Sequence, residues 1–145
     1  MSDLTAPVAA DCQATLHPQA IEGLELFNSG HYFEAHEALE SAWREETGPV
    51  RDLYRSILQV AVVYLHITHC NYPGAIKVYQ RSQRWLNPWP ETCRGVSVDR
   101  LRQDLEVVIQ EVHRLGPDHL EAFDLSLLKP VLYARTPPSF PHLLR

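Results

Sequence analysis

Cysteine is scarce in this sequence, and its placement argues against a fold built on disulfides or structural zinc. The 145 residues contain three cysteines, Cys12, Cys70 and Cys93. The number is odd and no two form a C-x-x-C pair, whereas disulfide scaffolds and zinc sites use even, closely spaced sets. We therefore interpret all three as free thiols, as expected in a reducing compartment.

Three other absences narrow the class of protein. The formal net charge is −5 with neutral histidines, whereas proteins that bind nucleic-acid backbones usually carry clustered Lys and Arg. The longest apolar stretch, residues 57–67, is about half of the ~20 residues that a membrane span needs. Residues 1–15 show no basic segment followed by an apolar one, as a secretory signal would. We expect a cytoplasmic protein that binds neither nucleic acid nor membrane.

No segment alternates apolar and polar residues as a strand does, but helical periodicity is present throughout. The spacing of apolar residues and the helix-ending Gly, Asn and Pro predict five helices: one from Pro18 that Asn28 and Gly30 end, three over about 31–47, 49–70 and 71–86, and one between Ser97 and Gly116. The third should be central, because its second half is apolar nearly all round. A short sixth helix is predicted over 126–133. The fold class is therefore all-α, a compact bundle of five to six helices built from antiparallel hairpins.

One domain accounts for most of the chain. We assign residues 17–135 to it, with a flexible N-terminal tail over 1–16 and a Pro-rich C-terminal tail over 136–145. The expected surface includes Trp85 and Trp89 beside a Pro-rich turn, and exposed aromatic residues of this kind can mark a contact with a partner.

The candidate site lies in the second helix, where polar residues do not all fall on the solvent side. His36 falls inside the apolar arc, and Glu40 follows one turn later at its edge. In an antiparallel hairpin with the third helix, Gln59 lies level with this pair, and His66 shares the face of Gln59. The candidate polar cluster is His36, Glu37, Glu40, Trp43, Arg44, Gln59 and His66.

Two interpretations of the cluster stay open. A buried His–Glu–Gln group would hold the helix hairpin in register, because an unpaired buried polar group costs about 1–3 kcal/mol. Alternatively, imidazole and carboxylate can bind a divalent metal or serve as a general base with its orienting partner, with His36, Glu40 and His66 as the ligands. The first requires a pair sealed from water, whereas the second requires an open pocket.

These alternatives define the function that we expect. The first is a non-catalytic binding or scaffold module for a protein or small-molecule ligand, without a cofactor and with a homodimer as one further expectation. The second is a metal-dependent or His/Glu-based hydrolase-like enzyme centred on His36 and Glu40. Arg51 and Arg55 are candidate anion contacts, although pairing with Glu45, Glu46 and Asp52 is the simpler expectation.

A motif that begins at the end of the first predicted helix and continues through the second resembles a known family. Its residues are Phe27, Asn28, Gly30, Tyr32, Glu34, His36, Glu37, Leu39, Glu40, Trp43 and Arg44, followed by Gly48, Pro49, Arg51, Gln59, His66, Asn71, Gly74 and Ala75. Over residues 24–86 this pattern is similar to that of the small helical family catalogued as domain of unknown function number 309. The resemblance implies a compact α-helical bundle and no particular activity. Ser56 departs from it, because the family usually has glycine there.

Overall fold

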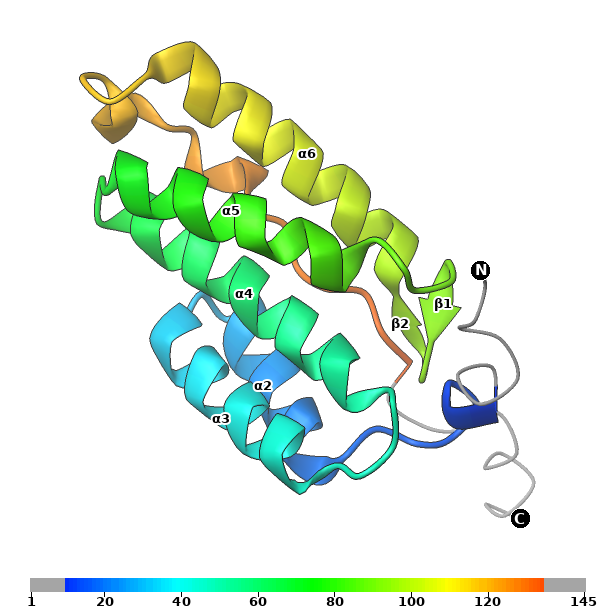
Figure 1. The fold of residues 1–145 in the computed structure, drawn as a ribbon. Coiled ribbons are helices and arrows are strands. Elements are labelled where there is room, and N and C mark those ends of the chain that lie inside the picture. The colour runs from blue at the N-terminus through cyan, green and yellow to red at the C-terminus, as the bar shows by residue number, and fades with distance from the viewer. Residues whose placement is uncertain (1–9, 135–145) are drawn as a thin grey trace.

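The all-α prediction is confirmed. A computed structural model describes residues 10–134, and within them five α-helices form the bundle. These are α2 (Pro18–Asn28), α3 (Tyr32–Glu45), α4 (Arg51–Thr68), α5 (Tyr72–Leu86) and α6 (Val98–Leu115). Helices α2 to α5 pack consecutively, with α4 between α3 and α5 as predicted, and α6 lies beyond α5 (Figure 1).

Local turn signals set the helix ends close to their predicted positions. Pro18 begins α2, and the His17 imidazole Nδ1 accepts a hydrogen bond from the Gln19 amide at 3.0 Å. Gly30 follows α2 with φ +83°, a left-handed conformation that glycine adopts without a steric penalty. Before α5, the Asn71 side chain accepts from the Gly74 amide at 3.0 Å. The ends of these helices are therefore determined locally.

The core is centred on α4. Nine of its residues are buried: Leu53, Tyr54, Ser56, Ile57, Val60, Ala61, Val63, Tyr64 and Ile67. The Tyr64 ring centroid lies 5.4 Å from that of Phe27 in α2 and 5.6 Å from that of Tyr32 in α3. Two aromatic residues of the motif thus serve to join three helices.

A short hairpin that the sequence did not predict lies between α5 and α6. Strand β1 (Thr92–Cys93) pairs antiparallel with β2 (Val96–Ser97). The two turn residues, Arg94 and Gly95, have φ of +51° and +81°, as a type I′ turn requires. Two-residue strands are too short to show the alternation by which strands are recognised in sequence.

The predicted helix over 126–133 is wrong. The structure has two 3-10 turns, η1 (Leu120–Ala122) and η2 (Leu125–Leu127), and then an extended segment. This segment runs alongside β2, where the Ser97 amide donates to the Leu132 carbonyl at 2.9 Å. Pro130 explains the difference, because it has no amide hydrogen and disfavours a helical conformation in the residue before it.

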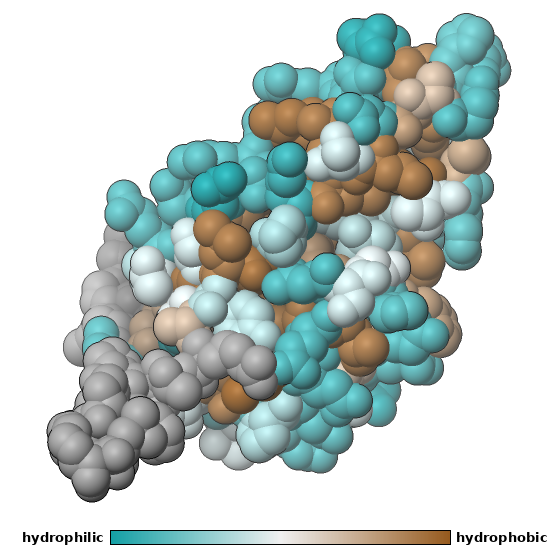
Figure 2. All heavy atoms as spheres, turned by 180° about the vertical axis from the view of Figure 1, so that it is seen from behind, coloured by the Kyte–Doolittle hydropathy of each residue, from teal (hydrophilic) through white to brown (hydrophobic). Residues whose placement is uncertain are grey.

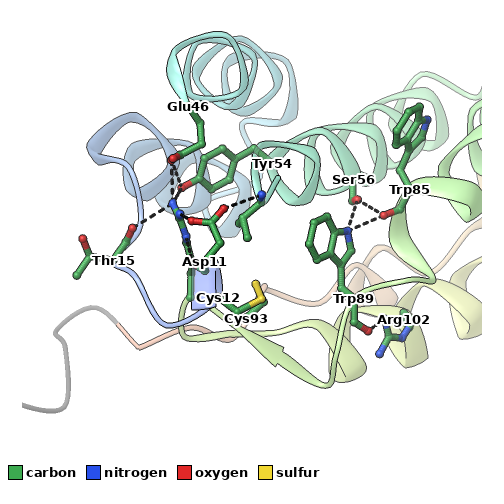
Figure 3. Close-up of a disulfide and its surroundings, with 12 residues drawn as sticks. Asp11, Cys12, Thr15, Glu46, Tyr54, Ser56, Trp85, Trp89, Cys93 and Arg102 are labelled. Atoms are coloured by element: carbon green, nitrogen blue, oxygen red, sulfur yellow. Dashed lines mark hydrogen bonds and ion pairs between the residues drawn. A yellow bond between two sulfur atoms is a disulfide. The ribbon is translucent and has the colours of Figure 1, made fainter. Parts of the chain in front are cut away.

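The interpretation of all three cysteines as free thiols is also wrong. Cys12 and Cys93, 81 positions apart, form a disulfide, and Cys70 is free and exposed (Figure 3). The sequence did not indicate this disulfide, because its two cysteines are not a closely spaced pair. Cysteine content therefore no longer supports a reducing compartment, and a cytoplasmic location stays a prediction.

The N-terminal segment before α2 lies against the domain at this disulfide. The Arg94 side chain is 4% exposed and donates to the Asp11 carboxylate, to Glu46 Oε1 at 2.8 Å and to Tyr54 Oη at 3.0 Å. Its Nε also donates to the Asp11 carbonyl at 2.8 Å (Figure 3). Residues 10–16, which the sequence assigned to a flexible tail, are thus held by covalent and ionic contacts. The rest of both predicted tails lies outside the described residues.

Apolar side chains are not confined to the core. The face opposite to that of Figure 1 shows apolar patches among polar residues (Figure 2). Among residues 10–134, four large apolar residues are exposed: Phe33, Val107, Leu125 and Leu132. Within residues 10–134 no helix is both long and apolar enough to cross a bilayer.

Candidate functional site

The predicted pair of His36 and Glu40 lies on an open surface of α3. His36 Nε2 is 4.0 Å from Glu40 Oε1, and the two side chains are 30% and 35% exposed. Phe33, one turn before His36, does not cover the pair: it is 53% exposed, and its ring centroid is 6.3 Å from that of His36. The pair is therefore neither closely bonded nor sealed from water.

Glu40 forms its shorter contact with another residue of the motif. Arg44 Nη2 donates to Glu40 Oε2 at 2.9 Å, one turn along the same helix. Arg44 and Glu37 are both exposed. These side chains belong to one surface, which we call the α3 face: Phe33, His36, Glu37, Glu40 and Arg44.

Gln59 and His66 of α4 do not join that pair. Gln59 Oε1 is buried and accepts no hydrogen bond within the described part of the chain. His66 Nδ1 lies 3.1 Å from Asn71 Nδ2, at the turn into α5. Partial burial, and then the neighbouring His69, lower the pKa of His66 below its ordinary value. The predicted cluster is thus divided among separate environments.

The ligand set for a metal is not assembled either. In residues 10–134 no group of three or more His, Cys, Asp or Glu side chains is arranged to hold a metal ion. No described His, Cys, Asp or Glu completes a set of three with His36 and Glu40, and His66 lies with Asn71.

Trp43, Arg51 and Arg55 come together, and two residues of α5 extend the group. Arg51 stacks on Trp43, with its guanidinium carbon 4.4 Å from the ring centroid. Arg55 lies between two indoles, 5.4 Å from Trp43 and 4.1 Å from Trp85, and Arg84 is 5.3 Å from Trp85. We call these five residues the Arg–Trp row.

Carboxylates that were expected to neutralise Arg51 and Arg55 have other partners. Glu45 pairs with His17 at 2.9 Å, and Glu46 pairs with Arg94 at 2.8 Å. Asp52 Oδ1 instead accepts a hydrogen bond from Trp43 Nε1 at 3.2 Å. The simpler expectation of surface ion pairs for the two arginines is therefore wrong.

Trp85 and Arg84 were not among the predicted site residues, although a signal for them was available. In an antiparallel pair of α4 and α5, Arg55 lies level with Trp85, so the helix register alone would have brought them together. The prediction that Trp89 is exposed is wrong: it is 6% exposed, and its indole donates to the Trp85 carbonyl at 2.7 Å.

Ser56, the departure from the family pattern, lies at this junction. It is fully buried, and its Oγ lies 2.6 Å from the Trp85 carbonyl oxygen. The Trp85 ring points away from this contact (Figure 3). Helices α4 and α5 therefore approach closely here although serine is larger than the glycine usual in the family. The Ser56 hydroxyl on α4 forms a hydrogen bond with the Trp85 carbonyl on α5.

Comparison with known proteins supports the resemblance drawn from the motif. A family model described as domain of unknown function (DUF309) matches residues 20–78, whereas the motif suggested 24–86. The match covers most of α2, all of α3 and α4 and the first part of α5, so Trp85 lies outside it. A comparison with curated proteins found no match. Residues 20–78 of this chain therefore match the DUF309 family model.

Proposed function

We propose that the domain is a non-catalytic binding module that engages a protein partner through the α3 face. The observation that carries this proposal is the exposure of the motif's side chains around His36 and Glu40. A structural clamp requires buried, mutually bonded groups, whereas a pair that is about one-third exposed at 4.0 Å adds little to stability. We therefore assign the exposed side chains of the α3 face to contact with a partner.

Phe33 supports a protein as the partner. A large aromatic side chain that is 53% exposed leaves apolar area in contact with water. Covering that area on binding is favourable by about 25 cal/mol per Å². Aromatic residues are also enriched among those that dominate binding energy.

The charges around Phe33 define the chemistry of the partner. Glu34 and Glu37 are exposed, and no ion pair within residues 10–134 involves either carboxylate. A partner that presents an apolar group to Phe33 and Lys or Arg to these carboxylates would complement this surface.

Site-specific photocrosslinking tests the proposal. A photoreactive phenylalanine analogue replaces Phe33, and a matched protein carries it at Val107 of α6, which is 49% exposed. The partner that crosslinks from position 33 is then purified and titrated against the wild type and a Phe33→Ala, Glu37→Ala variant. We expect a discrete partner from position 33 alone, with affinity about tenfold weaker in the variant.

The control for the titration is Val107→Ala, which should bind as the wild type does. Equal crosslinking from both positions, or unchanged affinity after removal of Phe33 and Glu37, would show that the α3 face does not recognise the partner.

A further inference from the structure

The Arg–Trp row contains a cation that is held in place without an anion. The Arg55 guanidinium lies between the indoles of Trp43 and Trp85, 5.4 Å and 4.1 Å from their centroids. A guanidinium group over an aromatic ring still has N–H donors along its edges that can bind an acceptor. None of those donors has an acceptor among residues 10–134.

The guanidinium groups of Arg51 and Arg84 also have N–H donors without an acceptor in the described residues. Arg51 uses Nε to donate to the Trp43 carbonyl at 3.1 Å, which leaves its terminal nitrogens without an acceptor in the described region. Arg84 is exposed, and its guanidinium carbon lies 5.3 Å from the centroid of the Trp85 ring. Three guanidinium groups thus lie along two indoles, and no carboxylate of the described residues forms an ion pair with any of them.

This arrangement does not follow from an excess of basic residues. The chain has 18 acidic and 13 basic residues, so acidic partners are plentiful. Five other arginines of the described region form ion pairs: Arg44, Arg94, Arg100, Arg102 and Arg114. The three positive charges of the row are therefore a local feature of α4 and α5, and their mutual repulsion would be relieved by a bound anion.

We propose that the Arg–Trp row is a binding site for a phosphate dianion, free or as a monoester of a small molecule. Arg55 is its central donor, and Arg51 and Arg84 contribute from either side. The stacked guanidinium presents a fork of parallel N–H groups, which matches two oxygens of a phosphate.

The charge and number of donors favour phosphate over a carboxylate. The two oxygens of a carboxylate are satisfied by a single guanidinium fork, whereas the oxygens of a phosphate can accept from more than one arginine. A dianion also balances more of the three positive charges. A nucleic acid is a poorer fit, because the net charge of −5 opposes a long polyanion and the site is only a few residues long.

The alternative role for Arg55 is structural, as a stacked contact that joins α3, α4 and α5. The two roles differ in what they require. Structural stacking needs only the guanidinium between the rings, whereas binding needs its free N–H edges and the charge of Arg84, which lies outside the sandwich. This inference is independent of the proposed partner of the α3 face, since neither Phe33 nor Glu37 takes part.

Titration with defined anions tests the site. Inorganic phosphate and glycerol phosphate are added to the full-length protein at constant ionic strength, with acetate and chloride as reference anions. Binding is followed by calorimetry and by the emission of Trp43 and Trp85. We expect saturable binding of phosphate or its ester and none of acetate at the same concentrations.

Three variants locate the site. Arg55→Ala and Arg84→Ala should each weaken binding by about tenfold or more, the loss expected for one charge-assisted hydrogen bond. Arg55→Lys keeps the charge but not the planar fork and should weaken binding similarly. Arg114→Ala on α6 makes the same change of net charge and should bind as the wild type does. Tighter binding of glycerol phosphate than of phosphate would identify the ester as the ligand form.

Several results would overturn the proposal. These are absence of saturable phosphate binding by the wild type, equal binding of acetate, full affinity in Arg55→Lys, or equal weakening by Arg114→Ala. Circular dichroism checks the fold of each variant. Because the Arg84 side chain is exposed and forms no hydrogen bond within residues 10–134, its variant should stay folded even if Arg55→Ala does not.

Discussion

Asn28 and Val131, which are 103 residues apart, are joined by two hydrogen bonds between a side chain and a backbone. The Asn28 amide nitrogen donates to the Val131 carbonyl at 3.0 Å, and the Val131 amide donates to Asn28 Oδ1 at 2.7 Å. The side chain therefore pairs with the extended C-terminal segment as a neighbouring strand would. This gives the asparagine of the family motif a structural role.

Replacing Asn28 with alanine should lower the free energy of unfolding by about 1–3 kcal/mol, because both backbone groups of Val131 lose their partners. Urea unfolding followed by circular dichroism measures the change. Asn87→Ala, an exposed asparagine at the end of α5, is the matched control and should change stability much less. Equal losses in the two variants would contradict the role given to Asn28.

The disulfide predicts the number of reactive thiols. Unfolded without reductant, the protein should expose one thiol per chain, that of Cys70, and after reduction it should expose three. Thiol titration with a chromogenic disulfide measures both numbers. Three reactive thiols in the unreduced protein would show that Cys12 and Cys93 are not paired.

Loss of this disulfide should also destabilise the fold. Closing a loop of this length lowers the entropy of the unfolded chain, which corresponds to about 4–5 kcal/mol. A Cys12→Ser, Cys93→Ser variant should therefore unfold at lower urea concentration. Cys70→Ser should unfold as the wild type does, because its thiol is exposed and unpaired.

Arg94 should be among the residues least tolerant of change. Arg94→Met removes a buried cation and leaves the carboxylates of Asp11 and Glu46 without it, at a cost of about 3–5 kcal/mol. Arg100→Met, which removes a more exposed ion pair with Asp104, should cost less than about 1 kcal/mol. Chemical unfolding of both variants compares them, and a similar loss in each would contradict the importance of burial.

His66 should titrate below its ordinary pKa of 6.5 in the folded protein, mainly through burial and secondly through His69. Because the folded state then binds its proton less readily than the unfolded state, this histidine contributes stability above pH 6.5. That contribution is lost as the pH falls from 6.5 through the lower pKa of the folded state. NMR titration of the imidazole measures the value. His69→Gln should raise it, whereas His113→Gln on α6 should leave it unchanged.

The helices could be predicted because their signals are local. In α2, Pro18 and Gly30 mark the ends, and in α5 the Asn71 cap does so. The wrong prediction of a helix over 126–133 also concerns a local signal. Pro130 disfavours a helix there, and this effect is stronger than the helical spacing of the apolar residues. The resemblance to DUF309 also came from one continuous motif.

The candidate site was only partly predictable. His36 and Glu40 are neighbours on one helix, so their proximity follows from helical geometry. Whether water reaches this pair depends on whether the Phe33 side chain covers it. The rotamer of Phe33 does not follow from the spacing of residues along the helix. The contact of Arg55 with Trp85 depends on how α4 and α5 pack against each other, which the sequence of either helix alone does not give.

The sequence by itself therefore determined the five α-helices and the resemblance to DUF309, because periodicity and turn residues act over a few positions. Only the tertiary structure decided which distant groups meet: Cys12 with Cys93, Asp11 with Arg94, and Arg55 with both Trp43 and Trp85. These pairings depend on helix register and on competition for partners. Glu46, for example, pairs with Arg94 and is not available to the arginines near it in sequence.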